Sequence, residues 1–416
     1  MISGCESVSN GSVSIDENQA EPEAPIEVRL TMDQVIDSSG VFEQVHTADG
    51  ALALKSTAGG QWLQFELPVP VSGRYRSAVI ASAAGQGGTV WIEDYVDNPD
   101  GRTYNVTGEI AVPVSTEVTE CTRDGSPFAA GKHPLRLHFN DTGVEVHELR
   151  FTLLRRHRMT PEVLTQEMSG DTWEIAWSDE FDGSGPVDTT KWTFDIGDWG
   201  WGNNELQYYT ANRLRNARRE NGNLIIEAHK NDDGHAWTSA RLTTRGKVTF
   251  RYGKIELRAK VPAHRGNWAA GWTLGDAYVD ELSWPYCGEI DILESVGYEV
   301  DNATGDGKAH ASVHCRAFYF KEDSHHTSTL PVKDIHNTFH TYAVVWTPEG
   351  ITAYVDDQPY FTYNDTTDER TWPFNEPQNI ILNLAMGGGW GGAQGMDPDM
   401  PSQQYILDYV RVYARK

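Results

Sequence analysis

Residues 288–294 read GEIDILE, a short run in which acidic and aliphatic side chains alternate. Successive side chains of a β-strand point to opposite faces, so Glu289 and Asp291 share one face of such a strand. Glu294 is five residues past Glu289 and would lie on the other face of a regular strand. A one-residue bulge at Ile292–Leu293 would bring it back beside the other two acids. The run therefore predicts a bulged strand with three carboxyl groups on one face.

Three carboxyl groups so close together favour acid–base chemistry. Like charges repel, so one carboxyl group usually keeps its proton near neutral pH. An ionised carboxylate beside a protonated carboxyl is the equipment of a retaining glycosidase, which holds the pair roughly 5–5.5 Å apart. An ordinary strand with a solvated acidic face stays open as an alternative from the strand alone. A metal site is a weaker alternative, because no histidine lies within ten residues of the run.

Tryptophans near the acidic run indicate a carbohydrate cleft. Trp284 stands just before it, and Trp268 and Trp272 lie in GNWAAGWTLGD (266–276). Indole faces are the usual platforms for sugar rings. Tryptophan is also a common core residue, so each of these residues taken alone fits packing as well as binding. Acids and tryptophans together favour a sugar-binding active site over a solvated strand.

Further motifs extend this pattern along the C-terminal part of the chain. They are, in order, WGNNELQYYT (201–210), NGNLIIEA (221–228), YGKIELRAKVP (252–262), WPYCGEIDILE (284–294), LNLAMGGGWGG (382–392) and DYVRVY (408–413). Their combination resembles glycoside hydrolase family 16, whose active-site strand has a bulged form with Glu-x-Asp-x-x-Glu spacing. The similarity is strongest to the laminarinase-like branch, which cuts β-1,3-glucans, and it covers roughly residues 173–416.

The resemblance implies a fold and a set of catalytic roles. Two antiparallel sheets would pack as a β-jelly roll with a long open cleft, which suits cutting inside a polymer. Glu289 would be the nucleophile and Glu294 the acid/base, with Asp291 holding the charge and orientation of Glu289. No cofactor is expected for catalysis. The candidate substrate contacts are Asn204, Arg258, Trp268, Trp272, Trp284, His314 and Trp390.

The family resemblance also bears on three histidines and on a calcium site. His314 is expected to approach the acid/base from a neighbouring strand. The segment FKEDSHHTSTLP (320–331) departs from the compact laminarinase pattern, and its His325 and His326 are candidates for the acceptor side of the cleft. Many family members carry a structural calcium on the convex side. The matching positions are Glu180, the backbone of Gly222 and Asp408.

The 416-residue chain is long for one domain and comfortable for two. Abundant Gly, Trp and Tyr, many short alternating runs and little helical periodicity predict an all-β protein. The N-terminal runs are QWLQFELPV (61–69), GRYRSAVIA (73–81), GTVWIEDYV (88–96), HPLRLHFN (133–140) and VHELRFTLL (146–154). Their spacing is typical of a β-sandwich, which we place at residues 26–156. Residues 157–172 are polar and unpatterned, as expected of a linker to the jelly roll at 173–416.

The N-terminal region resembles the family 6 carbohydrate-binding modules that precede many such hydrolases. Its candidate sugar contacts are Trp91, Tyr95 and Asn140. Trp91 lies between Val90 and Ile92 in a predicted strand, which fits core packing at least as well as binding. A structural sandwich that docks on the enzyme and binds no ligand is the open alternative.

Net charge narrows the range of partners. The formal charge is −26 and the pI is near 4.8, so a nucleic-acid partner is not expected. Long-range repulsion would also oppose a heavily sulfated galactan, which favours a neutral glucan as the polysaccharide substrate. This preference is modest, because salt screens such fields beyond about 10 Å.

The start of the chain, Ile2-Ser3-Gly4-Cys5, resembles the end of a bacterial lipoprotein signal, in which Cys5 would carry the lipid. We therefore expect a secreted or outer-surface location, with lipid anchoring through Cys5 left open. Residues 1–25 are expected to form a flexible tether. No apolar run of 18 residues occurs, so no transmembrane segment is predicted.

The remaining cysteines are Cys121, Cys287 and Cys315, and an odd number argues against a complete disulfide framework. A pair between Cys287 and Cys315 and a set of buried free thiols both stay open. We expect a monomer.

The sequence thus predicts an endo-acting, retaining β-1,3-glucanase. Relatives with the same bulged motif cut mixed-linkage β-1,3-1,4-glucans or β-galactans, so these substrates are the first alternative. A non-catalytic glycan-binding surface protein is the second alternative. The presence of both Glu289 and Glu294 counts against it, because a binding protein has no reason to keep the pair.

Overall fold

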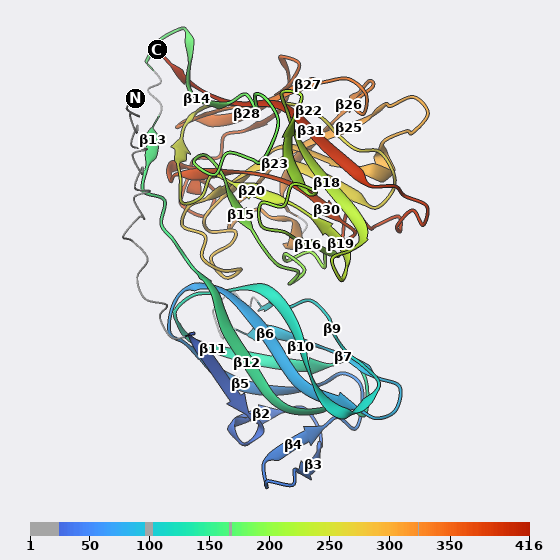
Figure 1. The fold of residues 1–416 in the computed structure, drawn as a ribbon. Helices are drawn as coiled ribbons and strands as arrows, with labels where there is room; N and C mark the ends of the chain where they lie inside the picture. Colours follow the sequence, from blue (N-terminus) through green and yellow to red (C-terminus); the bar gives the residue numbers. More distant parts are fainter. Residues whose placement is uncertain (1–24, 96–102, 166–168, 323) are drawn as a thin grey trace, which may run out of the picture.

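A computed structural model describes residues 25–95, 103–165, 169–322 and 324–416 (Figure 1). Strands dominate both halves of the chain, and the only helices in the described ranges are four single 3-10 turns. This confirms the predicted all-β class. Cys5 and nearly all of the expected tether lie outside the described residues, so lipid anchoring stays a prediction. Within the described ranges, no helix is long and apolar enough to cross a membrane.

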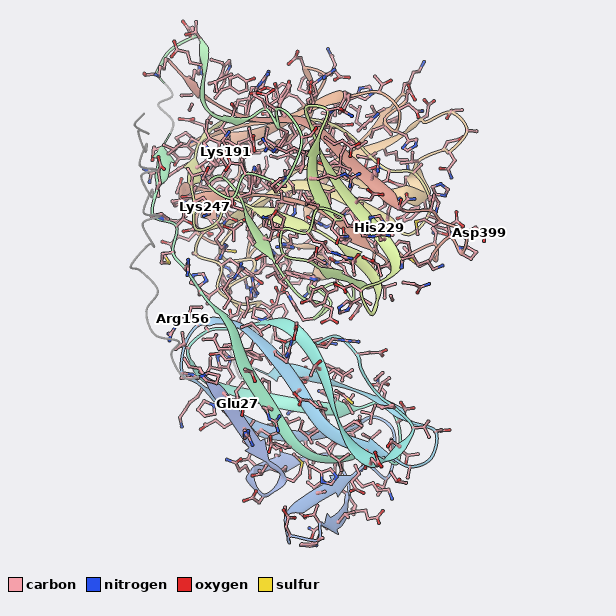
Figure 2. The ribbon with its side chains drawn as sticks, in the orientation of Figure 1. Glu27, Arg156, Lys191, His229, Lys247 and Asp399 are labelled. Carbon is pink, nitrogen blue, oxygen red and sulfur yellow. The ribbon has the colours of Figure 1, made fainter. Side chains whose placement is uncertain are left out.

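The N-terminal sandwich runs from Glu27 to Arg156, both labelled in Figure 2, and consists of two six-stranded sheets. One sheet has the order β10 (Ser115–Phe128), β6 (Gly73–Ala83), β12 (Glu145–Arg156), β4 (Leu52–Lys55) and β3 (Glu43–His46), with β1 (Glu27–Thr31) beside β12. The other has the order β2 (Asp37–Ser38), β5 (Gln61–Val69), β11 (Gly131–Phe139), β7 (Gly88–Tyr95) and β8 (Thr103–Asn105), with β9 (Ile110–Val112) beside β7. The five predicted runs are therefore strands.

The C-terminal half forms a second, larger sandwich. Its nine-stranded sheet has the order β13 (Val163–Thr165), β21 (Thr249–Arg251), β30 (Gln378–Met386), β23 (Asn267–Gly275), β24 (Glu289–Val296), β25 (Gly307–His314) and β26 (His326–Val332), joined by β20 (Arg241–Thr243) and β15 (Thr193–Asp195). Its ten-stranded sheet has the order β16 (Gln207–Tyr209), β19 (His235–Ser239), β18 (Asn223–Asp232), β31 (Gln403–Arg415), β22 (Gly253–Lys260), β27 (His340–Thr347), β28 (Gly350–Val355) and β29 (Gln358–Tyr363), joined by β14 (Trp173–Asp179) and β17 (Ala217–Glu220).

Strand β22 shows why these sequences form sheets. Ile255, Leu257 and Ala259 are fully buried in the core between the two sheets, whereas Lys254 and Arg258 stand on the other face and are partly exposed. Burying one face of a period-two pattern is the main driving force for such a strand. Strand β22 is therefore half-buried.

Part of the expected linker lies on the second sandwich. Residues 163–165 form β13, which pairs in parallel with β21. The Thr160 hydroxyl donates to Asp276 over 2.7 Å. Three residues are too few to show an alternating pattern, and the strand is held by backbone pairing with a neighbour that is distant in the sequence.

The described cysteines, Cys121, Cys287 and Cys315, are all buried free thiols. Of the two alternatives, the unpaired set is therefore correct. Burial raises the pKa of the Cys287 and Cys315 thiols, so neither is activated as a nucleophile.

Candidate active site

Strand β24 carries the three acids and contains the predicted bulge. On the β23 side Trp272 lies opposite Asp291 and Gly271 lies opposite Leu293, so Ile292 is the extra residue. A register shift on the β25 side falls between Asp291 and Glu294. Because Ile292 and Leu293 both point into the core, Glu294 returns to the face of the other two acids.

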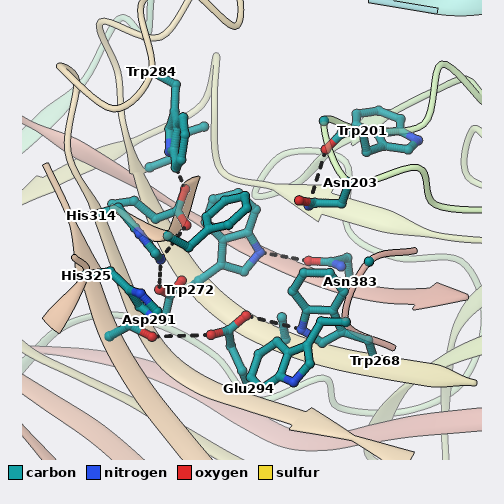
Figure 3. Close-up of a pocket in the computed structure, with 18 of the residues that line it drawn as sticks. Trp201, Asn203, Trp268, Trp272, Trp284, Asp291, Glu294, His314, His325 and Asn383 are labelled. Carbon is teal, nitrogen blue, oxygen red and sulfur yellow. Dashed lines mark hydrogen bonds and ion pairs between the residues drawn. The ribbon is translucent and has the colours of Figure 1, made fainter. Parts of the chain in front are cut away.

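The acids lie in a cleft of about 580 Å³ that is formed over the nine-stranded sheet (Figure 3). Asp291 and Glu294 are only 3% and 8% exposed, and Glu289 is partly buried. Six tryptophans line the cleft: Trp199, Trp201, Trp268, Trp272, Trp284 and Trp390. The structure thus brings together the acids and the four tryptophans that the sequence singled out as sugar contacts.

Two of these indoles bond to the outer acids. Trp284 donates its N–H to Glu289 over 2.9 Å, and Trp268 donates to Glu294 over 3.1 Å. Trp272 instead donates to the amide oxygen of Asn383 over 2.7 Å. Figure 3 shows these contacts converging on the cleft. Trp284 and Trp268 therefore fix the carboxyl groups of Glu289 and Glu294.

His314 faces the first acid of the strand. Because β25 runs antiparallel to β24, His314 lies opposite Glu289 and His310 lies opposite Glu294. His314 Nε2 is 3.3 Å from an oxygen of Asp291 and 3.7 Å from one of Glu289. The expectation that His314 approaches Glu294 is wrong, since the antiparallel register places His310 there.

Burial controls the charge of the three acids. Desolvation raises the pKa of Glu289, with repulsion from Asp291 adding to the shift and the nearby His314 opposing it. Desolvation likewise raises the pKa of Asp291 and, together with the Asp291 charge, that of Glu294. The three groups cannot all ionise at neutral pH, so the cleft holds at least one protonated carboxyl.

The family model for Glycosyl hydrolases family 16 matches residues 203–411, about half of the chain. This chain belongs to glycosyl hydrolases family 16. A β-glucanase of Rhodothermus marinus is 45% identical over 249 residues, which cover 58% of this chain and 85% of the relative. A glucan endo-1,3-β-glucosidase of Cryptopygus antarcticus is 35% identical over 267 residues, covering 58% of this chain and 92% of the relative.

A solved structure gives the same answer for the fold. The laminarinase of Rhodothermus marinus superposes with a TM-score of 0.55 at 45% identity, covering 58% of this chain and 98% of that structure. The likeness supports the jelly-roll expectation for the second sandwich. The protein is thus a family 16 glycosidase, with a polysaccharide as its class of substrate.

Two expected substrate contacts of the family 16 enzyme do not line the cleft. Arg258 lies on β22 in the opposite sheet, where it pairs with Asp408 and lies 5.0 Å from the ring of Phe339. Asn204 is exposed in a left-handed turn with φ of 57°, and its neighbours Asn203 and Glu205 line the cleft instead. Motif spacing alone could not place either residue, because the turn and the layer assignment determine where each side chain points.

The side chains of the two neighbouring histidines in the 320–331 segment lie in different surroundings. His325 lines the cleft and stacks on His314 with ring centroids 5.2 Å apart. His326 packs on Phe318 and Tyr363 instead. His325 therefore lies at the Glu289 end of the active-site strand.

Arg241 is a cleft residue that sequence reasoning missed. Its guanidinium lies between the rings of Trp201 and Trp272, at 4.9 and 4.8 Å from their centroids. It donates to Asp195 over 3.1 Å. No sequence signal marks it, because Arg241 belongs to a three-residue strand outside the recognised motifs.

Glu205 is a fourth carboxyl group in the cleft. It accepts hydrogen bonds from Gln207 over 2.6 Å and from Asn203 over 3.2 Å. Burial raises its pKa to about 7, although these donors oppose the shift. The turn that contains Asn203 and Glu205 thus supplies polar groups at the cleft wall.

Of the three positions expected to bind calcium, the two carboxylates of Glu180 and Asp408 have other partners. Glu180 accepts two hydrogen bonds from Arg411, at 3.0 and 2.7 Å, and Asp408 pairs with Arg258. Guanidinium groups already balance both carboxylates and would repel a cation, so these residues do not fit a calcium ion. Within the described ranges, one group of three potential metal ligands occurs, formed by Glu289, Asp291 and His314 with their ligand atoms within 4.8 Å.

Proposed function

We propose that this family 16 enzyme is an endo-acting, retaining β-1,3-glucanase. The observation that carries the proposal is the arrangement on β24, where two outer acids each receive an indole N–H and flank the buried Asp291. Two carboxyl groups in unlike surroundings are what a double displacement requires.

Glu289 is the proposed nucleophile. Its carboxylate attacks the anomeric carbon, and the glycosidic C–O bond breaks as Glu294 gives its proton to the departing oxygen. Glu294, now ionised, takes a proton from water, and that water breaks the glycosyl–Glu289 bond. Two inversions at the anomeric carbon give a product of retained configuration.

The surroundings of the two acids suit these roles. Glu289 must be ionised to attack. Burial raises its pKa and opposes ionisation, and the nearby His314 and the Trp284 N–H partly offset this effect. Glu294 must be protonated, and burial beside Asp291 favours its neutral form. Asp291 lies between them at 3.3 Å from His314, where it can hold the charge and proton balance of the pair.

The proposed substrate is a neutral β-1,3-glucan. Trp268, Trp272 and Trp390 are the partly exposed indoles of the cleft and give stacking surface for sugar rings. The chain's charge of −26 opposes strongly anionic polymers. The similar proteins carry β-glucanase, glucan endo-1,3-β-glucosidase and laminarinase names, which supports the same linkage here. Mixed-linkage glucans and β-galactans are the alternative substrates.

Reducing-end release from laminarin tests the proposal, with barley glucan and porphyran assayed in parallel. We expect rapid appearance of oligosaccharides from laminarin, formed first as the β-anomer in an NMR time course. Glu289→Gln keeps the shape of the side chain and should abolish release. Activity on a galactan alone would overturn the substrate, and full activity of Glu289→Gln would overturn the nucleophile. Binding of laminarin without any release would favour the non-catalytic alternative.

We also propose that the N-terminal sandwich binds glycan on the outer face of its β2–β5–β11–β7–β8 sheet. Trp62 and Trp91 both lie opposite His138 in neighbouring strands, and all three side chains are partly exposed. Trp91 stacks on His138 with centroids 4.0 Å apart, which places it outside the core. A row of aromatic rings beside Arg136 resembles a sugar platform.

Asn140 and Tyr95 are the other two predicted sugar contacts in this sandwich. The Asn140 amide donates to Thr89 and Glu109, each over 3.1 Å. The side chain of Tyr95 lies outside what the structure describes.

Affinity electrophoresis in laminarin gels tests the platform, with Trp91→Ala and the control Val118→Ala made in the Glu289→Gln background. Unchanged retardation of the Trp91 variant would contradict this role.

A further inference from the structure

The N-terminal sandwich is joined to the catalytic jelly roll by close backbone contact. Asp198 donates its N–H to the carbonyl of Asp124 over 3.0 Å, and the Asp124 N–H returns a bond of 2.9 Å to the Asp198 carboxylate. Two glycines make this approach possible: a Cβ on Gly197 would come within 2.1 Å of Asp124 O, and one on Gly125 within 2.4 Å of Ile196 O. A loosely tethered module would not need such a fit.

A shared buried carboxylate also connects the sandwich to the cleft. Arg155 of the sandwich donates to Asp195 over 2.9 Å and to the carbonyl of Phe194 over 2.7 Å. Asp195 also accepts from the cleft residue Arg241. Burial opposes ionisation of Asp195, but the charges of Arg241 and Arg155 hold its pKa well below its usual range. Arg155 of the sandwich and Arg241 of the cleft therefore share Asp195 as their carboxylate partner.

The sandwich contacts the loop of residues 276–288, which connects β23 to the catalytic strand β24. The Tyr104 hydroxyl donates to the carbonyl of Trp284 over 3.1 Å, and the Ala129 N–H donates to Asp280 over 3.2 Å. Leu282 of the loop packs against the hydrophobic core of the sandwich. The loop thus has both polar and apolar contacts to the separate sandwich.

One of these contacts leads directly to the proposed nucleophile. Tyr104 and Trp284 are 4% and 6% exposed, and the same Trp284 donates its indole N–H to Glu289. Tyr104 therefore fixes the backbone of the residue whose side chain fixes the carboxylate. Lys321 of the cleft wall packs over the same pair, with its ammonium 4.5 Å from the Tyr104 ring and 5.5 Å from the Trp284 ring.

We propose that the N-terminal sandwich is a positioning element of the active site, acting through Tyr104 to hold Trp284 on Glu289. A loop of this length is costly to order, and the sandwich supplies a preformed surface that orders it before substrate arrives. A nucleophile displaced by about 1 Å loses much of its rate advantage. This proposal rests on the role of Glu289 given above, and it assigns the sandwich a task separate from glycan binding.

Tyr104→Phe in the full chain tests the proposal, because it removes only the hydroxyl. Its matched control is Tyr75→Phe, which removes the hydroxyl of another buried tyrosine and its bond to the carbonyl of Val71 within the sandwich. We expect Tyr104→Phe to lower kcat on laminarin about fivefold, as for the loss of one hydrogen bond, with KM unchanged because Tyr104 lies behind Trp284. Tyr75→Phe should lower Tm but leave kcat at its original value.

Hydrogen–deuterium exchange without substrate separates this proposal from the catalytic one. Peptides covering 276–288 should exchange faster in Tyr104→Phe than in the original protein or in Tyr75→Phe. Unchanged exchange together with an unchanged kcat would overturn the positioning role. Faster exchange with an unchanged kcat would also overturn it, since the loop would then be held without consequence for the chemistry. A fully active Glu289→Gln variant would overturn the nucleophile assignment and the link from Trp284 to the chemistry, whereas the exchange data would still show whether Tyr104 orders the loop.

Discussion

Trp284 donates its indole N–H to the carboxylate of Glu289, five residues further along the chain, over 2.9 Å. Trp268 makes the equivalent bond to Glu294 from the neighbouring strand β23. The two proposed catalytic acids thus have similar donors but differ in their other neighbours. His314 lies beside Glu289, and Ser312 lies 3.4 Å from Glu294.

Replacing each indole should move a different limb of the pH profile. Burial raises the pKa of Glu289, and the Trp284 N–H opposes that shift. Trp284→Phe should therefore raise this pKa further and move the acid limb of kcat/KM to higher pH by about one unit. The basic limb should stay in place. A profile lowered uniformly, without a shift, would contradict the assignment of Glu289.

Trp268→Phe should move the opposite limb. Burial and the Asp291 charge raise the pKa of Glu294, and the Trp268 N–H again opposes them. Loss of this donor should keep Glu294 protonated to higher pH, so the basic limb moves up by about one unit. Trp272→Phe is the control, since its N–H bonds to Asn383 and it should shift neither limb.

Glu294→Gln should raise the melting temperature near pH 7. Burial raises the pKa of Glu294 in the folded protein well above its unfolded value of about 4.3. Both states are protonated below about pH 4, whereas above it only the unfolded chain ionises freely, so the folded state loses stability as pH rises. Glutamine cannot ionise and so removes this loss of stability. Each kcal/mol regained should raise Tm by about 2–4 °C. Differential scanning fluorimetry from pH 4 to 8 should show that the Tm of Glu294→Gln exceeds that of the original protein by an amount that grows with pH. A Tm difference that does not change with pH would contradict this explanation.

Asp195→Asn should destabilise the protein strongly. The change leaves Arg155 and Arg241 without their shared carboxylate, at a cost of about 3 kcal/mol for a buried pair. The control is Glu66→Gln, which breaks an exposed pair with Lys132 and should cost less than about 1 kcal/mol. Urea denaturation of both variants measures the difference. Equal free energies of unfolding would show that Asp195 does not join the two sandwiches.

Chelation should leave the enzyme unchanged. Arg411 and Arg258 occupy the carboxylates of Glu180 and Asp408, and the proposed double displacement needs no metal ion. We expect equal Tm values and laminarin activities before and after dialysis against EDTA. A fall in Tm that calcium restores would show that the convex side binds the ion after all.

Local sequence was informative about β24. The alternation of GEIDILE and the five-residue separation of Glu289 and Glu294 predicted the bulge at 292–293, because pleat and bulge depend on a few neighbouring residues. The same reasoning found the strands of both sandwiches. It misplaced Arg258, since alternation indicates which side chains share a face but not which sheet the strand joins.

The sequence by itself determined the all-β class, the bulged strand and the three acids that share its face, since these depend on short-range backbone geometry. Only the tertiary structure decided which indole reaches which acid and that His314 faces Glu289, because strand register sets those contacts. It also decided that Tyr104 supports Trp284 from 180 residues away. Contacts at that separation arise from the packing of two sandwiches, and no local pattern in either segment encodes them.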